Sequence, residues 1–407
     1  MVLCFSRALG LLHPAVSDHH LRVAYIASCL ADELGLPPAE MPDVLIAGAL
    51  HDVAAVSSPV MVSLFDHALT HYRLGDSETS DDPHKHAFEG FALTRDFQPF
   101  AQAASAIRFH HVDWDFGRGN EFAGEAVPLV SHILHLADRI AVLPDAGRNI
   151  LEQTAGIRKT VMADSEKQFK PEIVAAFEEI SLRESFWLDV ACQHKETIIR
   201  NHFCKCEIKL DLGALEQLGR LFGRIIDYRS PFTATHSSGV AATAEALAQR
   251  LGMSFMESKL LRVAGYLHDI GKLVVPVEIL EKPGKLTDEE MFIIKQHPYH
   301  TYQILSTVPG LETVNTWASL HHERLDGKGY PFRQQEIPLG SRIIAAADVF
   351  TAITEDRPYR KGMDQAQSID VLDRLVLDRA IDGDVVAMLR SNFNEFHFIR
   401  SLSQQPA

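Results

Sequence analysis

Histidine and aspartate residues recur in the same order in the two halves of the 407-residue chain. The second half contains this set as His236, His268, Asp269, His297, His321, His322 and Asp348. The first half contains it as His19, His51, Asp52, His86, His110, His111 and Asp138. The copies lie 217 residues apart at the first His and the His-Asp pair, 211 at the middle His and the His-His pair, and 210 at the last Asp. Such ordered repetition indicates a tandem duplication of one domain.

These side chains are suited to binding metal ions that hydrolyse phosphoesters. Five imidazoles and two carboxylates exceed what one ion binds, and a mixed nitrogen and oxygen set suits first-row transition metals. Two ions about 3.5–4 Å apart can activate a bridging hydroxide and hold the attacking and leaving oxygens of a phosphoester. We therefore expect two ions in the second copy, with Asp269 as the bridging, catalytic carboxylate, and we also expect metal in the first copy.

The segments between these residues have the pattern of helices. Residues 240–251 are rich in strong helix formers. Thr287 or Asp288 is a typical N-cap, and residues 171–180 begin with a proline suited to a first turn. Alternation typical of strands is scarce apart from a short run at 206–210, and residues 361–398 supply closing helices. We predict an all-α protein of two tandem helical bundles, residues 1–205 and 206–407, with the boundary near 203–213.

The composition excludes several classes of protein. Hydrophobic residues make up 46% and charged residues 23%, which is typical of a globular chain. The formal net charge of −15 argues against binding DNA or RNA polymers. Five cysteines without a repeated spacing indicate free thiols in a reducing compartment, and Cys204 and Cys206 lack zinc-knuckle spacing. No signal peptide and no apolar run of about 18 residues is found. We expect a cytoplasmic protein that does not contact membranes.

Longer motifs around the second copy resemble the HD-GYP family. They are His268-Asp269-Ile270-Gly271-Lys272, the segment 321–331 that ends in Gly329-Tyr330-Pro331, Ala347-Asp348-Val349-Phe350, and Arg357-Pro358-Tyr359-Arg360. The resemblance covers roughly residues 212–398. It implies an all-α bundle, a binuclear or trinuclear iron or manganese centre, and hydrolysis of cyclic di-GMP or a related cyclic dinucleotide.

The resemblance also implies roles for individual residues. The family's metal ligands fall on the seven residues of the second copy, and its phosphate-contacting lysine falls on Lys272. Its phosphate-clamping basic pair falls on Arg357 and Arg360, which agrees with the ability of Arg to neutralise phosphate in bidentate fashion. Tyr330, in the signature loop, either stacks on a base or packs the loop.

The chain departs from the family pattern at two positions. Members with a third metal carry a glutamate where this chain has Phe232, so we expect two ions rather than three. An aspartate that is frequent three residues after the last ligand is Thr351 here, which bears on the residues around the ligands rather than on the reaction.

The first copy keeps every ligand position but not the positions that contact substrate phosphate. Ala55 corresponds to Lys272, Gly147 corresponds to Arg357, and the loop at 112–120 contains no Gly-Tyr-Pro. This half resembles the wider HD superfamily, which includes phosphohydrolases of nucleotide monoesters. Two interpretations remain open: removal of the 5′-phosphate from a linear product, or a regulatory or dimerising domain that merely retains metal. A homodimer is the possible assembly of the protein.

Three hypotheses for the whole chain follow. The first is a phosphodiesterase for cyclic di-GMP or cyclic GMP-AMP. The second is a cyclic dinucleotide sensor that signals through partner contacts, and the third is a nucleotidase in both halves. Binding alone requires no hydroxide-generating centre, and the Gly-Tyr-Pro loop with the arginine pair argues against a simple nucleotidase in the second half.

Overall fold

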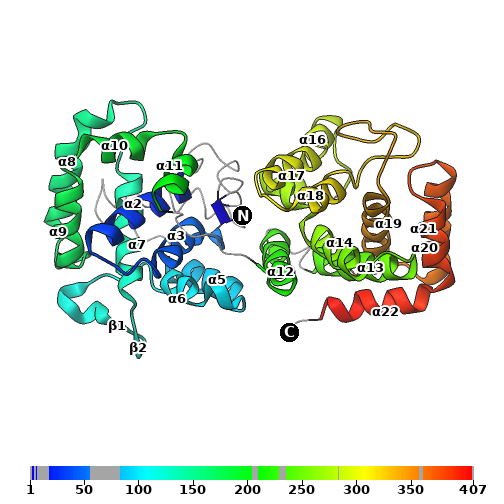
Figure 1. Cartoon of the computed structure of the whole chain (residues 1–407), viewed down its shortest axis with the longest axis horizontal. Coiled ribbons are helices and arrows are strands. Elements are labelled where there is room, and N and C mark those ends of the chain that lie inside the picture. Colours follow the sequence, from blue (N-terminus) through cyan, green and yellow to red (C-terminus); the bar gives the residue numbers. More distant parts are fainter. Residues whose placement is uncertain are drawn as a thin grey trace. The chain divides into compact units, whose positions relative to one another are not determined.

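The computed structural model describes residues 2–3, 6, 18–55, 83–203, 210–228, 235–282, 284–356 and 361–405. The chain divides into two units, residues 2–208 and 209–407, and both are built almost entirely from helices (Figure 1). The prediction of an all-α protein with two helical bundles is therefore confirmed. No described helix combines the length and the apolar character that a bilayer-spanning segment requires.

The first unit contains helices and one short hairpin. Its helices are α2 (His19–Glu33), α3 (Met41–Leu50), α5 (Pro83–Thr94), α6 (Ala101–Arg108), α7 (Leu129–Val142), α8 (Ile150–Ala163), α9 (Pro171–Ile180), α10 (Glu184–Ala191) and α11 (Lys195–His202). Strands β1 (Glu121–Phe122) and β2 (Glu125–Ala126) pair antiparallel, with Glu121 opposite Ala126. The described part of this unit also contains two 3-10 helices, η2 (Gln98–Phe100) and η3 (Asp115–Asn120).

The second unit contains helices alone among its described residues. They are α12 (Leu212–Tyr228), α13 (His236–Arg250), α14 (Phe255–Leu267), η4 (Ile270–Val274), α15 (Val277–Leu280), α16 (Asp288–Ile294), α17 (His297–Ser306), α18 (Glu312–Ser319), α19 (Leu339–Thr354), α20 (Gln365–Leu377), α21 (Gly383–Ser391) and α22 (Phe393–Ser403).

The same helix contacts recur in both units and place the candidate ligands. Helix α2 packs against α3 and α7, and helix α13 packs against α14 and α19 in the same way. A Cβ added to Gly48 would lie 2.7 Å from the Ala24 Cα, and one added to Gly265 would lie 2.6 Å from the Ala241 Cα. These glycines allow the two helix backbones to touch. Each lies three residues before a candidate ligand histidine, so the contact fixes where that histidine lies.

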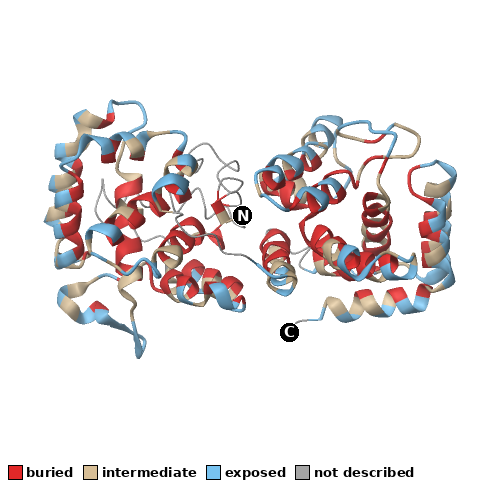
Figure 2. Ribbon diagram, viewed as in Figure 1, coloured by how far each residue is buried: buried red, intermediate tan, exposed pale blue. Residues whose placement is uncertain are grey.

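Each unit has its own apolar core. Ile26, Leu30 and Leu50 are fully buried in the first unit, and Phe222, Phe350 and Phe396 are fully buried in the second. Figure 2 shows the buried residues on the faces that the helices of a unit turn toward one another. Burial of these faces holds the helices together, since short helices are only marginally stable alone in water.

Several local predictions can be compared with the helices. Thr287 is the N-cap of α16, and its hydroxyl accepts a hydrogen bond from the Glu290 N–H at 3.2 Å, as predicted for a helix start. The helix predicted at 171–180 is α9, and α20, α21 and α22 are the predicted closing helices. Cys204, Cys206 and all but the last residue of the strand-like run at 206–210 lie outside the described residues, and residue 210 itself is not in a strand. The boundary at 205/206 stays a prediction.

Candidate metal centres

In the second unit, candidate ligands come from the ends of several helices. His236 and His297 are the first residues of α13 and α17, and Asp348 lies within α19. The other ligands follow directly after α14 or close to the end of α18: His268, Asp269, His321 and His322. The structure brings all seven together in three overlapping groups whose ligand atoms lie within 4.8 Å of one another. His236 Nε2 lies 3.0 Å from Asp348 Oδ1.

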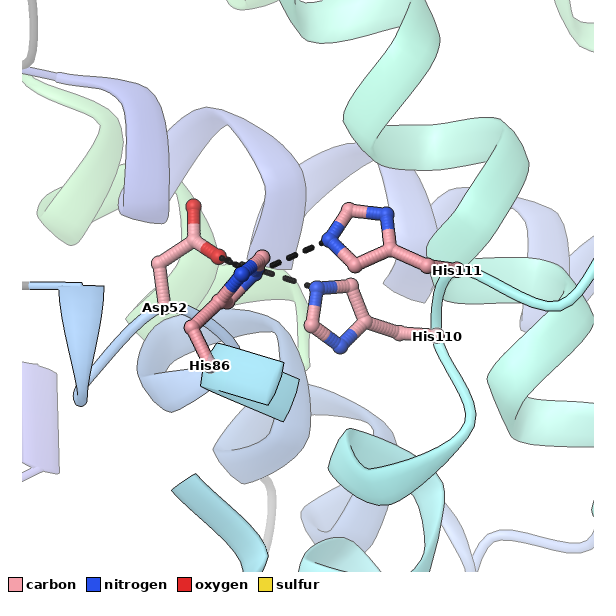
Figure 3. Close-up of side chains that lie close together, drawn as sticks. All are labelled: Asp52, His86, His110 and His111. Atoms are coloured by element: carbon pink, nitrogen blue, oxygen red, sulfur yellow. Dashed lines mark hydrogen bonds and ion pairs between the residues drawn. The ribbon is translucent and has the colours of Figure 1, made fainter. Parts of the chain in front are cut away.

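The corresponding residues of the first unit also converge. One group is Asp52, His86, His110 and His111, and another is His19, His51 and Asp52. Figure 3 shows the first group around the Asp52 carboxylate, whose Oδ1 lies 3.1 Å from His86 Nε2. Asp138 Oδ1 lies 3.1 Å from His19 Nε2, which places the last predicted ligand beside the second group.

The candidate ligand histidines are held by backbone carbonyls of the preceding turn. His51 Nδ1 lies 2.9 Å from the Gly48 oxygen, and His268 Nδ1 lies 2.7 Å from the Gly265 oxygen. The same contact to the third preceding residue is made by His110, His297 and His321. When Nδ1–H donates to a carbonyl in the neutral ring, Nε2 carries the lone pair, which points into the cluster and can bind a metal ion.

The unpaired atoms of these clusters fit metal ions. His110 Nε2, His268 Nε2 and Asp269 Oδ1 are buried and make no well-formed hydrogen bond, although each lies 3.2–3.6 Å from an atom of another candidate ligand. Buried polar atoms without partners are costly, and a cation would satisfy them. The two oxygens of Asp269 face different histidines, with Oδ2 3.2 Å from His268 Nε2 and Oδ1 3.3 Å from His297 Nε2. A carboxylate placed in this way is suited to bridging two ions.

Burial and neighbouring charges set the protonation of these groups. Burial lowers the pKa of His297 to about 3 and that of His321 to about 4, so both rings are neutral at pH 7. Burial alone would raise the pKa of Asp269, but the charges of His268 and Lys272 outweigh it and hold that pKa well below its usual range. Neutral imidazoles and ionised carboxylates are the forms that bind metal.

Two of the predicted substrate-contacting residues lie at this cluster. Lys272, on η4, places its Nζ 2.5 Å from Asp269 Oδ2. Tyr330 stacks on the ring of His322, and Lys295 Nζ lies 5.6 Å from the Tyr330 ring centroid. Arg357 and Arg360 lie outside the described residues, as does Phe232.

The sequence analysis missed two buried glutamates that support the site. Glu323 accepts hydrogen bonds from the backbone N–H groups of Phe332, Arg333 and Gln334, at 2.7, 3.1 and 3.0 Å. It thereby anchors the loop that carries Tyr330. Glu355 lies against His236 Nδ1. Glu355 could have been found in the sequence from its position seven residues after Asp348, two helical turns further along the same face.

The first unit has a different environment around its candidate ligands. The loop after His111 forms η3 and the hairpin instead of a Gly-Tyr-Pro turn. His135, on α7, places Nδ1 2.9 Å from the His110 oxygen and Nε2 3.1 Å from Asp113 Oδ1. These two contacts, one to each ring nitrogen, fix the orientation of the His135 ring. Ala345 occupies the corresponding position of the second unit.

Known proteins resemble the chain over nearly its whole length. The HD domain family matches residues 16–143 and again residues 220–385. A 3′3′-cGAMP-specific phosphodiesterase 1 of Vibrio cholerae is 30% identical over 99% of this chain and 93% of its own. The crystal structure of the V. cholerae cyclic GMP-AMP-specific phosphodiesterase V-cGAP3 matches 97% of this chain and 96% of its own, with 27% identity and a TM-score of 0.65.

A further relative matches a smaller part. The cyclic di-GMP phosphodiesterase response regulator RpfG of Xanthomonas campestris is 41% identical over 36% of this chain and 39% of its own. The repeated ligand sets and the HD domain matches coincide in both units, and the whole-length relative is a phosphodiesterase. The chain therefore belongs to the HD-GYP family of HD-domain phosphodiesterases and contains two HD domains.

Proposed function

We propose that the second unit hydrolyses one phosphodiester bond of a cyclic dinucleotide and releases a linear dinucleotide with a terminal phosphate. The observation that carries this proposal is the position of Asp269, whose two oxygens face different ligand histidines while Lys272 lies against it. Two bound ions would supply a hydroxide and stabilise the developing charge. The reaction adds one water, breaks one P–O bond and leaves a phosphomonoester and a free hydroxyl group.

The residues of the chain have separate roles in this proposal. The seven candidate ligands would hold the ions, and Asp269 is the carboxylate suited to contacting both. Lys272, Arg357 and Arg360 neutralise substrate phosphate without binding metal, since guanidinium and ammonium groups compensate phosphate charge. Tyr330 forms a wall beside His322 against which a base can lie.

The comparisons favour cyclic GMP-AMP as the substrate over cyclic di-GMP. The relative and the solved structure that match nearly the whole chain are both named for cyclic GMP-AMP. RpfG, which is named for cyclic di-GMP, matches about a third of the chain. The base preference would be measured by offering both nucleotides to the same metal-loaded protein.

For the first unit we propose removal of the 5′-phosphate from the linear product. Its seven candidate ligand positions converge as those of the second unit do, whereas Ala55 stands where the second unit has Lys272. A site without that cation holds a cyclic diester poorly, but a terminal phosphate can coordinate metal directly. The rival interpretation is a regulatory domain that retains its ligands.

Product analysis by chromatography separates these roles. Asp269→Ala should leave the cyclic substrate intact and lower metal content, while the protein still dephosphorylates an added linear dinucleotide. The matched variant Asp52→Ala should open the ring normally and accumulate the phosphorylated linear product. Near-normal ring opening by Asp269→Ala would refute the first proposal. Absence of inorganic phosphate release by the wild-type protein would refute the second and leave the regulatory interpretation.

A further inference from the structure

One candidate ligand of the second unit is held differently from its neighbours. His268, His297 and His321 each direct Nδ1 to a backbone carbonyl three residues earlier. His236 instead has the Glu355 carboxylate at Nδ1, with each oxygen 3.2 Å away. A carboxylate at this nitrogen orients the ring and raises the basicity of the nitrogen that binds metal.

Glu355 is well placed for this contact. It directly follows α19, which carries Asp348, so one helix and its end supply acids to both nitrogens of His236. The residue is only 5% exposed. A buried carboxylate requires partners, and His236 is one of them.

The end of α22 supplies another partner of Glu355. Gln404 Nε2 donates to Glu355 Oε2 at 3.2 Å, and Arg400 donates to Gln404 Oε1 at 2.6 Å. Helix α22 packs against α13, whose first residue is His236 (Figure 1). A Cβ on Gly239 would lie 2.9 Å from Gln404 Nε2, so this glycine allows Gln404 to approach α13.

The last turn of α22 is also fixed to the start of α13. Gln404 Nε2 donates to the Thr235 oxygen and Ser403 Oγ donates to the Ser238 oxygen, both at 3.2 Å. These acceptors flank His236 in the sequence. The end of α22 therefore contacts both the backbone around His236 and the Glu355 carboxylate that faces His236 Nδ1.

We propose that Glu355 is a positioning residue for His236 and that Gln404, at the end of α22, holds Glu355 in place. Helix α22 then supports the second-unit metal centre through Gln404, in addition to burying the apolar core. This inference rests on the metal centre of the proposed function. Loss of such a support typically costs 10- to 100-fold in metal affinity.

The first unit provides a matched control. Asp145 occupies the position that corresponds to Glu355 by the 210-residue offset. Its carboxylate accepts a hydrogen bond from the Gly147 N–H at 2.9 Å, which is a contact within its own loop. Asp145→Asn changes charge at the equivalent place without touching the arrangement behind His236.

The test is calorimetric titration of the chelator-treated, full-length protein with Mn²⁺. Glu355→Gln keeps the shape of the side chain and should weaken one class of Mn²⁺ sites about 10- to 100-fold. Gln404→Ala should weaken the same class by less, and Asp145→Asn should match the wild-type protein. Circular dichroism and thermal unfolding report whether each variant is folded, and Gln404→Ala carries the test if Glu355→Gln does not fold.

Two contrary results have different meanings. If Glu355→Gln is folded and binds Mn²⁺ with wild-type affinity, this inference is overturned while the metal centre stays in place. If only Gln404→Ala folds, wild-type Mn²⁺ affinity in that variant has the same meaning. Absence of Mn²⁺ binding by the wild-type protein would overturn the proposed metal centre and this inference with it. Glu355→Asp, with a shorter carboxylate, should recover part of the affinity lost in Glu355→Gln, which a purely structural role for the side-chain volume would not produce.

Discussion

The ring of Tyr330 stacks on the ring of His322, with centroids 4.8 Å apart and planes inclined by 27°. The signature loop therefore lies directly against a candidate metal ligand. Tyr330 also has the Lys295 ammonium over its ring. A candidate ligand, an aromatic ring and a positive charge therefore lie side by side at Tyr330, which suits the binding of an anionic nucleotide.

Replacing Tyr330 should separate the role of the ring from that of the hydroxyl. Tyr330→Phe keeps the stacked ring and should retain near wild-type kcat/KM. Tyr330→Ala removes an aromatic contact worth about 0.5–1.5 kcal/mol and should lower kcat/KM by about 2- to 10-fold. Steady-state kinetics with a cyclic dinucleotide would measure this, beside metal analysis. Equal loss in both variants would show that the hydroxyl, and not the ring, matters.

Glu323 should control the stability of the signature loop. Its buried carboxylate, only 3% exposed, accepts three backbone N–H groups, and hydrogen bonds to a charged group contribute about 1.5–3 kcal/mol. Glu323→Gln should speed proteolytic cleavage within residues 324–336 and raise KM. The control is Glu336→Gln, an exposed acid of the same loop. Equal cleavage rates in the two variants would contradict the anchoring role.

Metal uptake by the second unit should release a proton at pH 7. Burial lowers the pKa of His236, but hydrogen bonds to Asp348 and Glu355 outweigh it and raise that pKa to about 10. The metal-free ring is therefore charged at pH 7 and must lose its proton to bind an ion. Apparent affinity should increase as pH rises from 7 toward 10 and then level off.

Calorimetry in buffers of different ionisation enthalpy measures this release directly. We expect at least one proton, because the pKa of His236 is raised to about 10. Against the effect of burial, the Asp269 charge also raises the pKa of His268, whereas His297 and His321 are already neutral at pH 7. Glu355→Gln, which removes one of the acids that hold the proton, should flatten the pH dependence. Metal binding without proton release at pH 7 would exclude His236 as a ligand.

Arg357 should contribute to substrate binding and not to metal binding. This expectation rests on the family resemblance, because residues 357–360 lie outside the described residues. Arg357→Ala should lower kcat/KM by roughly 10- to 150-fold, equivalent to about 1.5–3 kcal/mol for one charge-assisted contact, with metal content unchanged. Arg374→Ala, an exposed arginine of α20, serves as the control. Loss of metal in Arg357→Ala would assign the residue a structural role.

The sequence predicts those parts of the site that are repeated in both halves. The candidate ligand histidines and aspartates could be predicted because the same residue types recur at nearly constant offsets. Glu323 and Glu355 lack this signal, since Val112 and Asp145 occupy their places in the first half. Their roles depend on which backbone groups and which imidazole nitrogen the fold brings to them.

The first and last residues of the helices also depend partly on local sequence and partly on tertiary contacts. The strong helix formers at 240–251 predict most of α13, but the helix begins earlier, at His236. Residues 236–239 include two serines and a glycine, which favour a helix weakly. Contacts of this turn with α22 and α19, which Gly239 allows, override that preference. Local propensity cannot reveal such contacts.

Five candidate ligand histidines each contact the backbone carbonyl of the third preceding residue: His51, His110, His268, His297 and His321. This arrangement has an evolutionary consequence. Each such ring is oriented by a short stretch of its own chain, so a copied segment inherits its orientation along with the histidine. The segments between the ligands are then free to diverge, as the loops at 112–120 and 323–334 have done. Duplication of such a domain can yield a new substrate preference by loop replacement, while the ability to bind metal is inherited unchanged.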